Sequence, residues 1–306
     1  MTTRRTVSLR GILAAVTTPF TADGSAVDED ALRAQANRLI DAGIHGLVPT
    51  GSTGEFSTLT PDEYRRVIEL YVDAAAGRVP VVAGIGALST AGAIELVQHA
   101  ERVGAAAVMV VPPFYDVLSL DALKTFLGDV AGATSLPIMY YNLPGNTGIH
   151  LTAAELAELG SIDGVDYIKD TSGDAVALTE LLVGHRDRIK AFNGWDTLTF
   201  FGLASGAEAS VWGVGGIVPE LAVQFWDALV ERKDIESARA LWGPLWEISS
   251  FLESVNYVAG VKAALEIVGY PVGPARRPVQ PLTPQRRAQL TDVLERAGAI
   301  RPHAIA

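Results

Sequence analysis

The chain has 306 residues, of which 49% are hydrophobic and 19% charged, with a formal net charge of −11 and no cysteine. This composition predicts a globular protein with a sizeable core, and it excludes disulfides, thiolate metal sites and a cysteine nucleophile. The negative charge argues against a nucleic-acid partner, and no stretch approaches the ~18 apolar residues of a membrane span. We therefore expect a cytoplasmic protein that binds neither nucleic acid nor membrane.

Short apolar segments alternate with segments of helical periodicity along most of the chain. Thr60 and Thr152 have the pattern of helix N-caps, with Glu63 and Glu155 completing capping boxes. In chain order, strands are predicted at residues 12–16, 46–48, 79–82, 106–111, 138–141, 165–168, 189–192 and 209–212. The helices between and after them are predicted at 29–41, 61–76, 90–103, 120–130, 152–159, 175–183, 197–204 and 220–231.

Eight strand–helix units in about 230 residues, with strands apolar on both faces, predict an α/β fold of the (β/α)₈ TIM-barrel type. An open doubly wound sheet is the alternative, but no Gly-x-Gly-x-x-Gly motif follows the first strand. Gly84-Ile85-Gly86 lacks the third glycine and comes after the third predicted strand. Only helical patterns follow, at 235–247, 251–268 and 284–297. We predict a barrel domain over residues 1–232 and a C-terminal helical domain over 233–306.

Lys169 directly follows the apolar segment 165–168. Lysine is seldom fully buried unless it is paired or used in chemistry. An amine in apolar surroundings loses proton affinity and becomes a nucleophile able to form a Schiff base. The alternative is a structural lysine that extends out of the barrel end and pairs with Asp170.

Other strand ends also carry polar residues. Ser52 and Thr53 lie in a glycine-rich turn whose N–H groups could bind an anion. Tyr141 ends the fifth strand and could relay protons, although aromatic core packing is the alternative. Asp196 follows the seventh strand, where it could instead cap the next helix. Because barrel chemistry occurs where strands end, we expect these residues and Lys169 to share one mouth.

Five motifs together carry a resemblance to a known family. They are Gly11-Ile12 with Thr17 and Pro19-Phe20, Gly51-Ser52-Thr53-Gly54-Glu55, Pro113-Phe114-Tyr115, Tyr141-Asn142-Leu143-Pro144 with Thr147-Gly148, and Ile168-Lys169-Asp170-Thr171-Ser172-Gly173-Asp174. In their order and spacing the chain resembles the dihydrodipicolinate synthase / N-acetylneuraminate lyase family over nearly its whole length. These are class I, Schiff-base-forming aldolases and dehydratases of the pyruvate type.

The resemblance implies a role for each matching residue. Lys169 corresponds to the lysine that attacks the keto carbon of a 2-oxo acid, and Tyr141 to the tyrosine that shuttles protons. Ser52 and Thr53 correspond to the loop that holds the 2-oxo-acid carboxylate. Tyr115 corresponds to a tyrosine inserted into the neighbouring subunit's site, which Thr53 links to Tyr141. The family also implies a homotetramer built from two dimers. Because the protonated imine itself accepts the electrons, no metal or organic cofactor is implied.

Differences from the family bear on the substrate. Asn146 stands where dihydrodipicolinate synthases carry an arginine, and an amide cannot form a charged pair with a carboxylate. Gly194 and Asp196 are similar to the residues of sialic-acid lyases that bind sugar hydroxyls. Thr171 and Val211 are implied as further substrate contacts. These lyases carry a glutamate where this chain has Thr197, which argues against sialic acid itself.

We therefore expect a lyase that binds a small 2-oxo acid and cleaves or dehydrates it through a lysine Schiff base. The substrate would be a 2-oxo-3-deoxy sugar acid or a hydroxy-2-oxo acid such as 4-hydroxy-2-oxoglutarate. One alternative is a synthase that condenses pyruvate with aspartate semialdehyde. A second is a barrel enzyme that grips phosphate through the glycine-rich residues 213–216. A third is a non-catalytic member that only binds 2-oxo acids.

Overall fold

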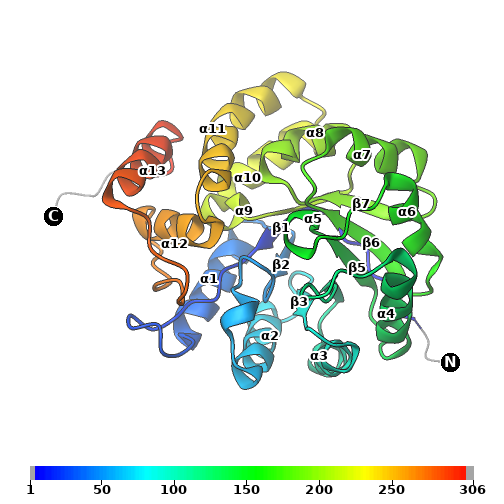
Figure 1. Cartoon of the computed structure of the whole chain (residues 1–306). Helices are drawn as coiled ribbons and strands as arrows, with labels where there is room; N and C mark the ends of the chain where they lie inside the picture. The colour runs from blue at the N-terminus through cyan, green and yellow to red at the C-terminus, as the bar shows by residue number, and fades with distance from the viewer. Residues whose placement is uncertain (1–3, 301–306) are drawn as a thin grey trace.

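Eight parallel strands form the centre of the computed structural model, which describes residues 4–300 (Figure 1). The strands are hydrogen-bonded in the order β2-β1-β8-β7-β6-β5-β4-β3, and a parallel bridge between Leu47 and Val81 joins the two ends. The predicted (β/α)₈ barrel with C-terminal helices is therefore confirmed. The strands are β1 (Gly11–Ala15), β2 (Gly46–Val48), β3 (Val82–Gly86), β4 (Ala107–Val111), β5 (Ile138–Asn142), β6 (Val165–Asp170), β7 (Lys190–Asn193) and β8 (Ala209–Trp212).

Helices follow the strands and cover the outside of the barrel (Figure 1). The expected capping boxes at Thr60 and Thr152 are both present. Two predicted helices end in a π-helical turn instead of continuing regularly, at Glu180–Gly184 and Asp227–Glu231. The helices are α1 (Glu29–Asp41), α2 (Pro61–Ala75), α3 (Thr90–Val103), α4 (Leu120–Gly132), α5 (Pro144–Thr147), α6 (Ala153–Glu158), α7 (Ala175–Thr179), α8 (Thr199–Ala204), α9 (Val214–Ile217), α10 (Pro219–Trp226), α11 (Ile235–Glu253), α12 (Tyr257–Ile267) and α13 (Pro284–Arg296).

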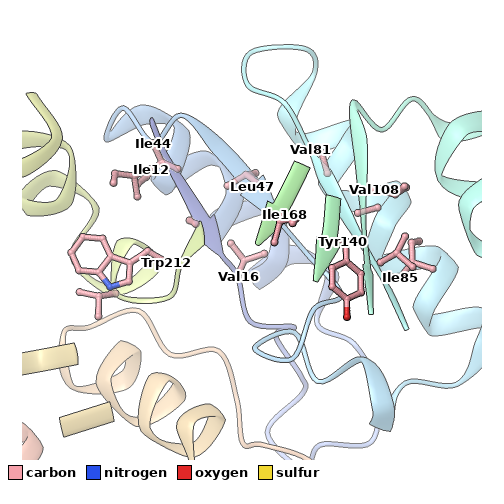
Figure 2. Close-up of a cluster of buried hydrophobic side chains, with 14 of the residues drawn as sticks. Ile12, Val16, Ile44, Leu47, Val81, Ile85, Val108, Tyr140, Ile168 and Trp212 are labelled. Carbon is pink, nitrogen blue, oxygen red and sulfur yellow. The ribbon is translucent and has the colours of Figure 1, made fainter. Parts of the chain in front are cut away.

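The buried side chains form two layers, because successive residues of a strand point to opposite faces of the sheet. The outer layer packs the strands against the helices and includes Ile168, Tyr140 and Trp212, as Figure 2 shows. The inner layer fills the barrel and includes Tyr167 and Tyr141. Since Ile168 faces outward and Tyr167 inward, Lys169 faces inward at the end of β6.

The third strand differs from the prediction, which put it at residues 79–82. The structure has β3 at Val82–Gly86, and the carbonyl of Pro80 accepts the N–H of Leu47 at 3.0 Å just before it. Gly84 and Gly86, which were expected to follow the strand, lie within it. A Cβ atom at Gly84 would lie 2.6 Å from the backbone of Thr50, so a glycine here lets the loop after β2 pack on β3.

The C-terminal helices lie on one side of the barrel, away from α4 and α6 (Figure 1). The sequence predicted a helix over 251–268, but α11 continues to Glu253, and α12 starts afresh where Asn256 caps it. We propose the domain boundary between residues 232 and 233; residues 301–306 of the predicted second domain lie outside the described residues. Among residues 4–300, no helix is both long and apolar enough to cross a membrane.

Candidate active site

A cavity of about 300 Å³ opens at the end of the barrel where the strands finish. Nine of the ten residues singled out from the sequence line it: Ser52, Thr53, Tyr141, Asn146, Lys169, Thr171, Gly194, Asp196 and Val211. The tenth, Tyr115, does not. Its side chain is 86% exposed on the loop after β4, so the link from Tyr141 through Thr53 to Tyr115 is not formed within one chain.

Lys169 lies inside the barrel and is only 6% exposed. In the β5–β6 ladder it is the direct partner of Tyr141, and its Nζ lies 4.0 Å from the centroid of the Tyr141 ring. Among the described residues it forms no ion pair with Asp170 or any other carboxylate. The structural alternative, in which Lys169 leaves the barrel to pair with Asp170, is therefore not what the structure shows.

Asp170 instead fixes the end of β6. The amide of Asn142 donates to its Oδ1 at 2.7 Å, and the hydroxyl of Ser172 donates to its Oδ2 at 3.0 Å. Burial raises the pKa of Asp170, and these hydrogen bonds oppose that rise. The neighbouring strands β5 and β6 are thus tied together one residue beyond Tyr141 and Lys169.

The glycine-rich turn after β2 is held from several directions. The hydroxyl of Thr18 donates to the carbonyl of Gly54 at 2.7 Å, and the hydroxyl of Thr50 donates to the carbonyl of Gly84 at 2.8 Å. Thr50 and Glu55 both have φ near +55°, a left-handed conformation that non-glycine residues adopt at a cost. Such strain persists only where the surrounding contacts over-determine the backbone.

A buried ion pair supports this turn from behind. The carboxylate of Glu55 lies 2.7 Å from the Nζ of Lys262 on α12, and both side chains are at most 4% exposed. Glu55 also accepts the backbone N–H of Arg276 at 2.8 Å. Burial lowers the pKa of Lys262, while Glu55 opposes that shift. The C-terminal region therefore anchors the turn that carries Ser52 and Thr53.

Asp196 lies across the cavity, in the turn after β7. Its carboxylate accepts the hydroxyl of Tyr257 at 2.5 Å and the backbone N–H of Gly213. Burial raises the pKa of Asp196 to about 7; the charge of Glu253 adds to this rise, and the Tyr257 hydrogen bond opposes it. Asp196 does not cap the next helical turn, so the capping alternative is not supported.

Two polar side chains of the cavity were not foreseen from the sequence. Tyr257 begins α12, and Glu253 ends α11. Glu253 accepts both the backbone N–H and the hydroxyl of Thr197 at 2.9 Å. No local motif marks either residue, because both reach the cavity only through the packing of the C-terminal helices on the barrel.

The glycine-rich residues 213–216 do not form an open phosphate grip. Gly213 directs its N–H to Asp196, and the four residues of α9 that follow are buried. A Cβ atom at Gly215 would lie 2.9 Å from Ile12 of β1, so this segment packs against the barrel wall.

Gly194 lies against Lys169 and leaves no room for a side chain of its own. A Cβ atom there would lie 2.6 Å from Cε of Lys169 and 2.4 Å from Oγ1 of Thr171. We expect Gly194→Ala to displace the lysine and lower kcat/KM about 100-fold, as a misplacement of about 1 Å can. Steady-state kinetics check this. Gly128→Ala is the control, because nothing lies within 4 Å of its Cβ position, and unchanged kinetics in both variants would contradict the prediction.

Comparison with known proteins identifies the class of this barrel. The model of the dihydrodipicolinate synthetase family matches residues 8–297. The members are class I lyases that form a Schiff base, and the chain is an enzyme of that class. It belongs to the dihydrodipicolinate synthetase family.

Individual relatives match over almost their full length. A DapA-like lyase of Halobacterium salinarum is 39% identical over 284 residues, which cover 93% of this chain and 92% of the relative. A 4-hydroxy-tetrahydrodipicolinate synthase of Methanopyrus kandleri is 37% identical over 295 residues, which cover 95% of this chain and 97% of the relative. The dihydrodipicolinate synthase of Acinetobacter baumannii, solved in complex with pyruvate, superposes with a TM-score of 0.91 at 31% identity, covering 96% of this chain and 100% of that one.

Proposed function

We propose that this enzyme cleaves a 2-oxo-3-deoxy sugar acid to pyruvate and an aldehyde through a Schiff base on Lys169, or dehydrates it through the same imine. The observation that carries the proposal is the charge of the cavity. Lys169 is the only basic side chain among the described residues that line it, and Asp196 and Glu253 are its acidic ones.

In this reaction the amine of Lys169 adds to the keto carbon C2, and loss of water gives a protonated imine. A base then takes the proton of the C4 hydroxyl, the C3–C4 bond breaks, and its electron pair moves into the imine to give an enamine and the free aldehyde. Protonation of the enamine at C3 and hydrolysis release pyruvate and the lysine. Tyr141, whose ring lies beside the Lys169 amine, is the proposed carrier of these protons.

The turn after β2 supports binding of the 2-oxo-acid carboxylate. Glu55 and Phe56 donate their N–H groups back into the turn, whereas the N–H groups of Ser52 and Thr53 have no acceptor among the described residues. Both residues line the cavity, so these donors are available to an anion there. Pyruvate, which the Acinetobacter relative binds, has this carboxylate and keto group.

The far end of the cavity favours a hydroxylated chain over a second carboxylate. Asn146 lies exposed at the rim, and no arginine lines the cavity within residues 4–300. A second carboxylate would meet Asp196 and Glu253, while Lys169, the one basic side chain among the described lining residues, is engaged with the keto carbon. This argues against aspartate semialdehyde and 4-hydroxy-2-oxoglutarate, although several relatives are named as synthases.

Substrate competition tests the proposal. We expect 2-oxo-3-deoxygluconate to be converted with a kcat/KM at least about 100-fold above that for 4-hydroxy-2-oxoglutarate, because discrimination against an unpaired buried charge is large. Pyruvate release is followed by a coupled assay and dehydration by mass spectrometry. Condensation of pyruvate with aspartate semialdehyde at a comparable rate would favour the synthase. Binding of pyruvate without turnover of any of these acids would favour the non-catalytic alternative.

The proposed enzyme is a cytoplasmic homotetramer in which Tyr115 of one subunit completes a neighbour's site. The high exposure of this tyrosine on the loop after β4 supports that arrangement.

A further inference from the structure

We infer that Tyr257 and Glu253, which the C-terminal helices bring to the cavity, select the hydroxyl-bearing chain of the substrate by positioning Asp196. This inference rests on the proposed function and extends it from the reacting lysine to the opposite wall of the cavity. Neither residue is expected to touch the carbon atoms that react, so both are positioning residues.

Two donors hold the carboxylate of Asp196. Tyr257, the first residue of α12, donates its hydroxyl to Oδ2 at 2.5 Å. Gly213, which directly follows β8, donates its N–H. A Cβ atom at Gly213 would lie 2.1 Å from the Tyr257 hydroxyl oxygen, so the three groups are in tight contact. A carboxylate has about four acceptor sites, which leaves capacity for a hydroxyl in the cavity that Asp196 lines.

Glu253 holds the residues on either side of Asp196. Its two oxygens accept the N–H and hydroxyl of Thr197, and its carboxylate also accepts a hydrogen bond from the side chain of Trp195. Burial raises the pKa of Glu253, and these hydrogen bonds oppose the rise. The turn that presents Asp196 is therefore fastened to the end of α11, in addition to the local hydrogen bonds between Asn193 and the backbone of Trp195.

The charged groups around Asp196 come from several elements. Glu253 of α11 faces it as a second acid, Lys169 of β6 as a cation, and Tyr257 of α12 as a hydrogen-bond donor, while Tyr141 of β5 faces Tyr257. With a pKa of about 7, Asp196 is present in both protonation states near neutral pH. A sugar hydroxyl donates a stronger, charge-assisted hydrogen bond to the ionised carboxylate than it forms with the neutral acid, whereas an aliphatic chain can pair with neither.

The test compares ligands that share the 2-oxo-acid head but differ in the chain. The probes are 2-oxo-3-deoxygluconate and 2-oxohexanoate, which has six carbons and no hydroxyls. Turnover gives KM for the first, and borohydride trapping gives the half-saturating concentration of the second. We expect Tyr257→Phe to raise KM for 2-oxo-3-deoxygluconate about tenfold or more and to change trapping of 2-oxohexanoate less than about twofold. Tyr270→Phe is the matched control, because Tyr270 does not line the cavity.

The pH dependence separates positioning from general loosening of the fold. At each pH, KM for 2-oxo-3-deoxygluconate is divided by the half-saturating concentration of 2-oxohexanoate. This ratio cancels the contribution of enzyme groups that act on both ligands alike, such as Lys169. Tyr257→Phe removes a hydrogen bond that lowers the pKa of Asp196, so the inflection in this ratio should move to higher pH. Glu253→Gln removes a charge that raises the pKa, so the inflection should move to lower pH.

Three results would overturn the inference. They are an unchanged KM in Tyr257→Phe, an equal loss of affinity for both ligands in that variant, and inflections that shift in the same direction in Tyr257→Phe and Glu253→Gln. Wild-type enzyme that traps pyruvate but does not bind 2-oxo-3-deoxygluconate would also overturn it while leaving the Schiff-base chemistry intact. Failure of wild-type enzyme to trap pyruvate would instead overturn the proposed function.

Discussion

Replacing Lys169 with alanine is expected to lower kcat by about 10⁴-fold or more and to abolish covalent trapping of pyruvate by borohydride. The loss should be this large because every bond-making step of the proposed mechanism passes through the amine. Tyr141 and the turn after β2 can still bind the substrate, but they cannot provide the electron sink. Intact mass and peptide mapping of the trapped enzyme measure the adduct and its position.

The fold of the Lys169→Ala variant should survive. The lysine is buried and forms no ion pair with a described residue, so its removal relieves a desolvation cost as well as creating space. Lys190→Ala is the control, since Lys190 is half-exposed and pairs with Glu208 at 3.0 Å. A reduced adduct on any other lysine, or substantial turnover by Lys169→Ala, would exclude the proposed role.

Replacing Glu55 with glutamine is expected to lower the free energy of unfolding by about 3–5 kcal/mol. The substitution removes one charge of a pair that is almost completely buried and leaves Lys262 uncompensated. Lys262 keeps its hydrogen bonds to the carbonyls of Thr18 and Pro274, both at 2.9 Å, but these are neutral acceptors. Urea denaturation followed by circular dichroism measures the change.

Lys262→Met and the double variant complete a thermodynamic cycle. The double variant should lose much less stability than the sum of the single ones, because it buries no unpaired charge. Glu208→Gln is the matched control for an exposed pair and should cost about 1 kcal/mol or less. Additive losses in the cycle, or a Glu55→Gln variant as stable as this control, would show that the buried pair does not stabilise the turn.

Local sequence was sufficient for the barrel and, through the strand ends, for Ser52, Thr53, Tyr141, Lys169 and Asp196 of the candidate site. The other cavity residues Asn146, Thr171 and Val211 were implied only by the family resemblance. Apolar strands that alternate with capped helices, as at Thr60 and Thr152, follow from short-range chemistry. In a barrel the strand ends converge, so polar residues that lie far apart in the chain could be assigned to one mouth. The predicted position of β3 was wrong because Pro80, Gly84 and Gly86 are residue types that often mark the end of a strand. The pairing of β3 with β4 instead places Pro80 before the strand and both glycines inside it.

The contribution of the C-terminal helices could not be predicted in this way. Glu253, Tyr257 and Lys262 lie in ordinary helical patterns, and each acquires its role from a partner more than 50 residues away in the chain. Periodicity and capping report on neighbours within a few residues, so they carry no information about such contacts.

The sequence by itself therefore determined the fold class and singled out Lys169 and Tyr141 as the candidate reacting pair, because strand periodicity and strand-end chemistry are local properties. The tertiary structure alone decided what surrounds Asp196 and what supports the turn after β2. Those environments depend on how α11 and α12 pack against the barrel, and burial and charge in a packed interface are set by groups that meet only after folding.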